Sequence, residues 1–178
     1  MKTGQTVEQI KGMIRSIPDF PSAGVMFRDI TTLLKDPTGL NLAVDTMAAL
    51  FDSNEFDIIV GPESRGFIFG VPLAYKLGKG FVPARKVGKL PAKTARKRYD
   101  LEYGAAEIEL HVDAIQPKDR IIIVDDLLAT GGTAKAVADL IAELGATVVG
   151  MAFLIELEAL NGRNTLAGYD NIKSVLSY

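Results

Sequence analysis

Two adjacent acids and a run of small residues stand together in the second half of the sequence. Asp125 and Asp126 precede two leucines and then Ala129, Thr130, Gly131, Gly132 and Thr133. Small side chains let backbone N–H groups close around an anion, glycines accept positive φ, and threonine hydroxyls donate hydrogen bonds. A phosphate monoester is the anion that fits such a turn.

The two acids need an explanation of their own, because a carboxylate repels a phosphate. Carboxylates accept hydrogen bonds from sugar hydroxyls, and they also bind metal ions. A sugar 5-phosphate suits both halves of the stretch, with its phosphate in the turn and its hydroxyls on Asp125 and Asp126. The plainer alternative is an ordinary strand-to-helix turn with an acidic end. The nucleotide-triphosphate loop does not match, since Phe67 and Met151 stand where that loop needs Lys.

The neighbouring residues predict a strand before the acids and a helix after the turn. Residues 121–124 read Ile-Ile-Ile-Val, which is typical of a strand buried on both faces of a parallel sheet, and we expect the acids to end it. Residues 134–144 carry apolar side chains at helical spacing, and Gly145 follows as a C-terminal cap. Open α/β sheets bind ligands where strands end and helices begin.

The same alternation runs along the rest of the chain. We expect helices over 5–17, from Pro37 to about 51, over 65–77 and within 157–166. We expect strands over 25–30, 56–60, 80–84, 107–110, 147–155 and 172–176. Buried strands that alternate with helices predict an α/β fold with a central, mostly parallel sheet flanked by helices. A length of 178 residues predicts a single domain over 1–178.

A second turn and a basic stretch also contain residues that bind anions. Ser64 and Arg65 follow the strand expected over 56–60, although a turn with a surface arginine explains them as well. Between residues 85 and 98, cations stand without a single acid: Arg85, Lys86, Lys89, Lys93, Arg96, Lys97 and Arg98. Three interpretations of these cations stay open: a solvated basic loop, a nucleic-acid patch, or a lid over a polyphosphate. We expect 93–98 to be a loop or to carry charges that steer an anionic ligand.

The composition argues against nucleic-acid-binding, membrane and secreted proteins. A net charge of −2 argues against a nucleic-acid partner, and no apolar run is long enough to span a membrane. The sequence contains no cysteine, which fits a reducing compartment. The first twenty residues are interspersed with charges, so no signal-peptide core is expected. We therefore expect a cytoplasmic protein without a membrane or nucleic-acid partner.

The stretch Asp-Asp-Leu-Leu-Ala-Thr-Gly-Gly-Thr at 125–133 resembles the phosphoribosyl-pyrophosphate motif of the type I phosphoribosyltransferases, in the form found in those that act on adenine. The residues at 64–67, 85–91 and 18–30 are similar to the family's pyrophosphate loop, its cationic segment and its base-binding segment. In the family, the peptide before the loop serine is often cis. The resemblance implies the family's fold, with a small hood formed by about 18–34 and 88–112, and a homodimer.

The resemblance also assigns roles. The ribose 5-phosphate would lie on residues 129–133. The pyrophosphate would be bound by Ser64, Arg65, Arg85, Lys86 and Lys89. Asp125 and Asp126 would stabilise positive charge on the ribosyl ring during transfer. Mg²⁺ would be held mainly by the substrate, with Asp125 as a protein contact.

The resemblance also assigns the residues that bind the base and exchange its proton. Phe27 would stack on adenine while backbone atoms around Met26 and Arg28 read its edge; without the resemblance, a core Phe beside a solvated Arg is the simpler explanation. A 6-oxopurine presents the reverse donor and acceptor pattern and would leave buried groups unpaired. Glu102 would exchange a proton with the imidazole ring, and Tyr103 would belong to the hood. Taken alone, Glu102 is an ordinary surface residue.

The implied reaction is adenine plus 5-phosphoribosyl-1-pyrophosphate giving AMP plus pyrophosphate, a purine-salvage step that uses Mg²⁺. Two alternatives stay open. The enzyme would act on another base, a 6-oxopurine or orotate, or the protein would be a non-enzymatic regulator that senses phosphoribosyl pyrophosphate. Such regulators usually append a nucleic-acid-binding domain, for which 178 residues leave no room.

Overall fold

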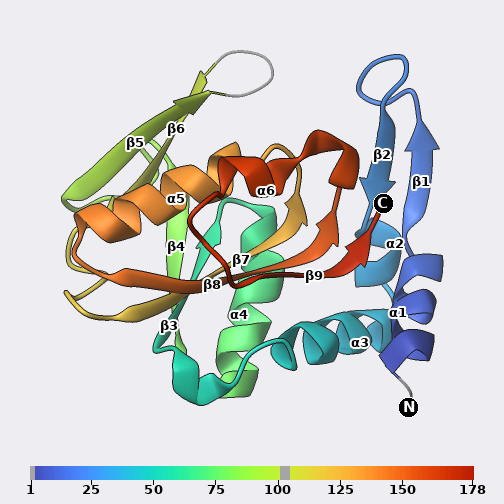
Figure 1. Ribbon diagram of the computed structural model, residues 1–178, viewed down its shortest axis with the longest axis horizontal. Helices are drawn as coiled ribbons and strands as arrows, with labels where there is room; N and C mark the ends of the chain where they lie inside the picture. The colour runs from blue at the N-terminus through green and yellow to red at the C-terminus, as the bar shows by residue number, and fades with distance from the viewer. Residues whose placement is uncertain (1–2, 101–104) are drawn as a thin grey trace. The chain divides into compact units, whose positions relative to one another are not determined.

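The computed structural model describes residues 3–100 and 105–178, and the chain divides into two compact units, 1–46 and 47–178 (Figure 1). Each unit is described by itself. The predicted single domain and the bounds of its hood stay predictions. No helix among the described residues is long and apolar enough to cross a membrane.

The first unit contains a short hairpin between helices. Its elements are α1 (Thr3–Gly12), β1 (Arg15–Pro18), β2 (Met26–Asp29), α2 (Thr31–Leu34) and the first part of α3 (Pro37–Ala48). β1 pairs with β2 in antiparallel register, from Arg15 opposite Asp29 to Pro18 opposite Met26. The helix expected over 5–17 is therefore wrong beyond Gly12, because the residues after Ile14 bond to a neighbouring strand instead. The extended segment expected over 25–30 is confirmed.

The second unit is built on one seven-stranded sheet in the order β5-β6-β4-β3-β7-β8-β9. The strands are β3 (Ile58–Pro62), β4 (Gly80–Lys86), β5 (Thr94–Asp100), β6 (Ala105–His111), β7 (Arg120–Leu128), β8 (Thr147–Glu156) and β9 (Ile172–Ser177). The pairs among β4, β3, β7, β8 and β9 are parallel, and only those that involve β5 and β6 are antiparallel. The predicted fold class is confirmed.

Helices cover both faces of this sheet. They are α4 (Arg65–Leu77), α5 (Gly132–Glu143) and α6 (Gly162–Thr165), with 3₁₀ turns η1 (Ser53–Glu55) and η2 (Glu158–Leu160). In Figure 1, α4 and α5 lie on opposite faces. Side chains of β7 alternate between them, since Ile121 and Ile123 join the core that contains α5, whereas Ile122 and Val124 lie with Leu73 of α4. The strand is buried on both faces, as predicted.

Two expectations are wrong for the same reason: the end of the strand that begins at 121, and the loop over 93–98. β7 does not end at the acids but runs to Leu128, because β8 continues beside it, with Leu127 opposite Ile155. Residues 94–98 are not a loop but the greater part of β5, which pairs with β6 from Thr94 opposite His111 onwards. A neighbouring strand supplies hydrogen-bond partners that local residue types do not reveal. The helix expected within 157–166 is two short turns, η2 and α6.

Candidate active site

The site lies where the strand order of the sheet reverses. From β3 the chain passes to β4 on one side, and β7 then takes the other side of β3. The carboxyl ends of β3 and β7 are therefore neighbours, with Val60 opposite Ile123. Open α/β sheets bind ligands at such a reversal. The turn after β3 and the acids of β7 meet there.

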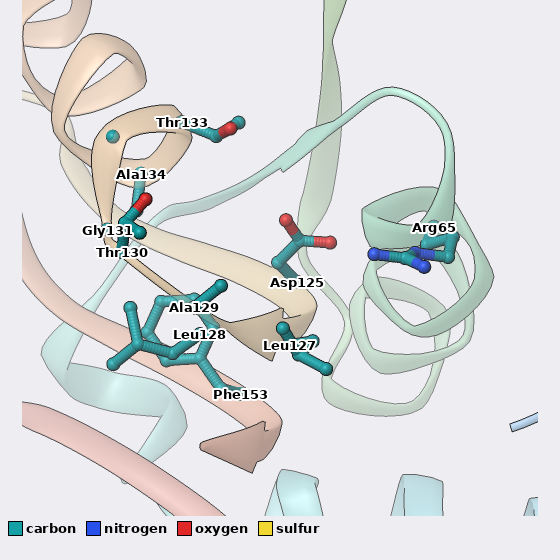
Figure 2. Close-up of a pocket in the computed structure, with 11 residues that line it drawn as sticks. Arg65, Asp125, Leu127, Leu128, Ala129, Thr130, Gly131, Thr133, Ala134 and Phe153 are labelled. Carbon is teal, nitrogen blue, oxygen red and sulfur yellow. The ribbon is translucent and has the colours of Figure 1, made fainter. Parts of the chain in front are cut away.

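The small-residue turn after β7 closes a pocket against the start of α5. This pocket is lined by Arg65, Asp125, residues 127–134 and Phe153 (Figure 2). Gly131 has φ +84, and a Cβ on it would lie 2.5 Å from the Gly162 carbonyl oxygen. Gly131 is also the N-cap of α5, where it has no side chain to accept from the first N–H groups of the helix. Those N–H groups and the positive end of the helix dipole suit an anion.

The two acids of β7 have different surroundings. Figure 2 shows the Asp125 carboxylate between Thr133 and Arg65, in the space that the pocket encloses. Asp126 is only 2% exposed, and its Oδ2 lies 2.9 Å from Arg65 Nε. Its Oδ1 is buried and has no hydrogen-bond partner among the described residues. Asp125 therefore faces the pocket, whereas Asp126 pairs with the Arg65 guanidinium.

Burial controls how both acids titrate. It raises the pKa of Asp125 well above its usual value, and the neighbouring Asp126 carboxylate raises it further. Burial also raises the pKa of Asp126, although the Arg65 guanidinium opposes that rise. A ligand that brings donors or positive charge to Asp125 would relieve the cost of its ionised form.

The turn after β3 is shaped by a cis peptide and by a glycine. The peptide between Glu63 and Ser64 is cis, as the resemblance implied. A Cβ on Gly66 would lie 2.7 Å from Pro62 Cδ and 2.8 Å from the Val124 carbonyl oxygen. Only glycine lets the first turn of α4 approach β3 and β7 so closely. Ser64 and Arg65 are thereby held beside the end of β7.

A wider cleft joins this turn to Asp125 and to strands β5 and β6. It is lined by Glu63, Ser64, Arg65, Lys86, Tyr99, Ala106, Asp125 and Thr133. Carboxylate, hydroxyl and cationic groups from β4, β7 and the beginnings of α4 and α5 thus surround one space. The arrangement can bind a ligand that carries a phosphate at one end, hydroxyls in the middle and a second, polyanionic group.

The comparisons with known proteins decide the family. The model of the phosphoribosyl transferase domain matches residues 29–177. The adenine phosphoribosyltransferase of Agathobacter rectalis is 54% identical over 172 residues, which are 97% of this chain and 98% of that protein. The chain belongs to the adenine phosphoribosyltransferase family.

Solved structures of this family have the same fold. The adenine phosphoribosyltransferase from Thermoanaerobacter pseudethanolicus matches with a TM-score of 0.93 and 51% identity, over 97% of this chain and 99% of that one. The enzyme from Saccharomyces cerevisiae matches with a TM-score of 0.92 and 36% identity, over 97% and 99%. That enzyme was solved with adenine and an imino-altritol bisphosphate bound.

The cleft brings together several of the residues to which the family resemblance gave roles. Ser64, Arg65, Lys86, Asp125 and Thr133 line it together. Residues 129–133 form the adjoining pocket. Arg85 is paired with the Glu63 carboxylate, at 3.1 Å from Nε to Oε2, and its Nη1 donates to the Lys89 carbonyl oxygen at 3.3 Å.

The residues assigned to adenine belong to the first unit. Met26, Phe27 and Arg28 lie in β2. Phe27 is half-buried and packs edge-on against Phe20, with ring centroids 5.1 Å apart. Glu102 and Tyr103 lie outside the described residues. The roles of these five residues stay predictions.

Tyr99 is a site residue that the sequence did not reveal. It comes from β5, lines the cleft, and its hydroxyl accepts from Thr133 Oγ1 at 3.4 Å. The segment was expected to be a loop, so no pattern placed the tyrosine beside the turn at 133. His111, at the end of β6, makes a structural contact, because its Nε2 accepts from the Ala92 N–H at 3.3 Å.

The described residues contain no group of three or more acids or histidines that could hold a metal ion by itself. Asp125 faces the cleft, and Glu63 lines the same cleft but is bonded to Arg85. Magnesium is commonly held by one or two carboxylates and the phosphates of a substrate. The donor set fits a Mg²⁺ that arrives mainly bound by its substrate.

Proposed function

We propose that the protein transfers the 5-phosphoribosyl group from phosphoribosyl pyrophosphate to N9 of adenine, giving AMP and pyrophosphate. The observation that carries the proposal is the cleft, in which Asp125 lies between the phosphate turn and the cations Arg65 and Lys86. Relatives named adenine phosphoribosyltransferase support adenine as the acceptor. Purine salvage is the role that such a reaction serves.

In this proposal the donor substrate lies along the cleft. Its 5-phosphate accepts from backbone N–H groups and hydroxyls of residues 129–133, and its ribose hydroxyls donate to Asp125. Its pyrophosphate contacts Ser64, Arg65 and the cations of 85–89. Mg²⁺, with Asp125 as a protein contact, would neutralise charge on the departing pyrophosphate.

Bond breaking at C1 of the ribose leaves positive charge on the ring, and in this proposal the Asp125 carboxylate, which lines both the pocket and the cleft, stabilises that charge. This stabilisation is greater in the transition state than in the ground state, so it raises the rate. Asp126 contributes by holding Arg65 rather than by touching the ribose. Adenine, stacked on Phe27, attacks from the opposite face, and Glu102 exchanges the imidazole proton.

We also propose a homodimer in the cytoplasm. Val71 and Tyr75 lie one helical turn apart on α4 and are 50% and 90% exposed. Exposed apolar side chains grouped in this way are typical of an interaction surface, and a second copy is the partner that the resemblance implies. The absence of cysteine supports a reducing compartment.

A single assay tests the function. Pyrophosphate release is measured with adenine, hypoxanthine, guanine and orotate in parallel, each with phosphoribosyl pyrophosphate and Mg²⁺. We expect release with adenine and at least about 100-fold less with the others, because a site built for one donor pattern rejects the reverse pattern. A higher rate with another base would overturn the assignment of adenine. Tight binding of RNA or DNA without turnover would favour the regulator.

A further inference from the structure

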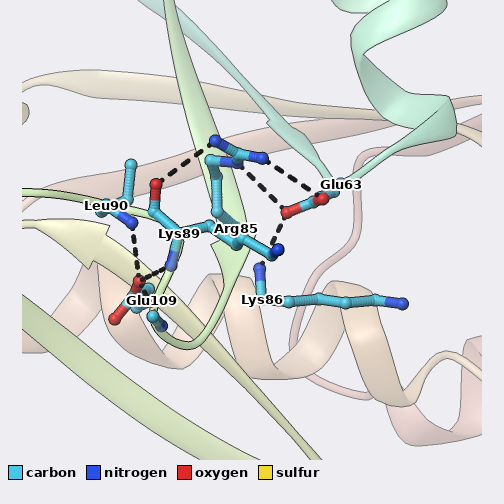
Figure 3. Close-up of polar contacts among 7 residues, drawn as sticks. Glu63, Arg85, Lys86, Lys89, Leu90 and Glu109 are labelled. Atoms are coloured by element: carbon cyan, nitrogen blue, oxygen red, sulfur yellow. Dashed lines mark hydrogen bonds and ion pairs between the residues drawn. The ribbon is translucent and has the colours of Figure 1, made fainter.

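The loop between β4 and β5 is folded around a buried acid. Glu109, on β6, is 0% exposed. Its Oε1 accepts from three successive backbone N–H groups, those of Gly88 at 2.9 Å, Lys89 at 3.1 Å and Leu90 at 3.1 Å (Figure 3). Successive N–H groups that converge on one point form a nest, which is a common binding site for anions. Here the nest is occupied by a carboxylate of the same chain, that of Glu109.

The second oxygen of the same carboxylate binds the other arm of the loop. Glu109 Oε2 accepts from Thr94 Oγ1 at 3.1 Å and lies 3.2 Å from Arg96 Nε, both on β5. Burial alone would raise the pKa of Glu109, but hydrogen bonds from the Leu90 N–H, the Thr94 hydroxyl and the Lys89 N–H together lower it. The carboxylate is therefore ionised at neutral pH and holds both arms.

A second acid holds the beginning of the segment. Glu63 Oε2 accepts from Arg85 Nε and from the Lys86 N–H, both at 3.1 Å. Figure 3 shows the two acids on opposite sides of the chain from 85 to 90, with Arg85 linked to Lys89 between them. The backbone of this segment is thus bonded to carboxylates at both of its ends.

Some cations between residues 85 and 97 form ion pairs, and others can still bind an anionic ligand. Arg85, Arg96 and Lys97 pair with Glu63, Glu109 and Glu143 respectively. The side chains of Lys86 and Lys89 are exposed, and neither has an ionic partner among the described residues. Lys86 lines the cleft beside Ser64 and Arg65. Unpaired ammonium groups on a fixed backbone suit a polyanionic ligand.

We propose that Glu109 is a positioning residue for pyrophosphate: it fills the nest from inside and so fixes the backbone that presents Lys86 and Lys89 to the leaving group. It acts through the 88–90 turn and does not touch the substrate. The inference rests on the proposed function, which assigns these lysines to pyrophosphate. It adds a residue that lies outside the motifs carrying the family resemblance.

The test measures pyrophosphate and AMP separately on the full-length protein by calorimetric titration. Glu109→Gln keeps the size of the side chain but removes the charge that the nest requires, and its amide N–H groups oppose those of the turn. We expect the dissociation constant for pyrophosphate to rise about tenfold or more, as for a lost charge-assisted hydrogen bond, with that for AMP unchanged within about twofold. The KM for phosphoribosyl pyrophosphate should rise more than kcat falls.

A second variant reaches the same turn without touching the buried carboxylate. Gly88 has φ +83, and a Cβ on it would meet no atom within 4 Å, so Gly88→Ala strains the turn and leaves the core intact. We expect it to weaken pyrophosphate binding in the same direction. Asp57→Asn is a control for the loss of a hydrogen-bonded carboxylate, because Asp57 also accepts several hydrogen bonds, from Arg120, but precedes β3, whereas the 88–90 turn follows the carboxyl end of β4.

The outcomes separate the inference from the proposed function. If Lys89→Ala and Lys86→Ala weaken pyrophosphate binding while Glu109→Gln and Gly88→Ala do not, the inference is overturned and the proposed function stands. If neither lysine variant changes pyrophosphate binding, the assignment of these cations fails and the inference fails with it. If Glu109→Gln loses affinity for AMP and for pyrophosphate equally, the substitution has disturbed the whole site, and the inference is overturned. If Glu109→Gln does not fold, Gly88→Ala decides alone.

Discussion

Asp125 and Asp126 are neighbours in sequence but have different surroundings. Alternation along β7 turns Asp125 towards the pocket and buries Asp126 against Arg65. Sequence reasoning gave both acids the same role, because a strand was not expected to continue through them. Of the two acids, only Asp125 lines the pocket and the cleft that the structure describes.

Replacing Asp126 should separate stability from activity. The raised pKa of Asp126 means that folding disfavours its ionised form, so Asp126→Asn should leave Tm unchanged or raise it. Arg65 loses its anchor, and kcat/KM for phosphoribosyl pyrophosphate should fall by about tenfold or more, equivalent to one charged hydrogen bond. Thermal unfolding and steady-state kinetics measure the two effects. Full activity in this variant would remove Asp126 from its role.

Asp125 should make the free protein less stable as the pH rises. The pKa of Asp125 in the folded state is raised above its usual value of 3.8. Between these two pKa values, the folded protein binds more protons than the unfolded chain. Stability therefore falls as pH rises from about 4 through the raised pKa. Urea unfolding between pH 4 and pH 8 should show this decline, and Asp125→Asn should flatten it. An identical decline in the variant would contradict the assignment.

At the scale of elements, the turn before α5 depends on close contact with the N-terminus of α6. Gly131→Ala introduces strain at φ +84 and a Cβ 2.5 Å from the Gly162 carbonyl oxygen. Gly78→Ala is a matched control, since φ is +65 there but no atom lies within 4 Å. Strain alone costs about 1–2 kcal/mol, so the control should lose about that much stability and Gly131→Ala more. AMP affinity should fall only in Gly131→Ala, and equal effects in both variants would show that the contact is unimportant.

The predictability of each element follows from the source of its stability. The first part of β7 and the helix α5 were predicted because their own residues carry the signal, an apolar run in one and apolar side chains at helical spacing in the other. β5 was missed because its sequence, Thr-Ala-Arg-Lys-Arg-Tyr-Asp, is charged and it becomes a strand only by pairing with β6. Tyr99 was missed with it. The nest around Glu109 was also invisible, since the acid lies about twenty residues from the turn that it binds.

At the scale of the whole molecule, the sheet explains why short segments distant in sequence form one site. The reversal of strand order at β3 places the ends of β3, β4 and β7 together, and each end contributes different groups. The turn after β3 supplies a hydroxyl and a guanidinium, β4 supplies the Lys86 ammonium group, and β7 supplies a carboxylate and leads into the small-residue turn. A phosphoribosyl pyrophosphate has matching groups in matching order.

The exposed face of α4 predicts that the protein assembles as a dimer. Tyr75 is 90% exposed and Val71 50%, so Tyr75→Glu places a charge in the centre of the proposed interface, where an unpaired buried charge is strongly unfavourable. Sedimentation should give twice the chain mass of 19.1 kDa for the unaltered protein and a single chain mass for Tyr75→Glu. Leu160→Glu, at an exposed apolar residue on η2, should remain dimeric. A monomeric unaltered protein, or a dimeric Tyr75→Glu, would place the interface elsewhere or remove it.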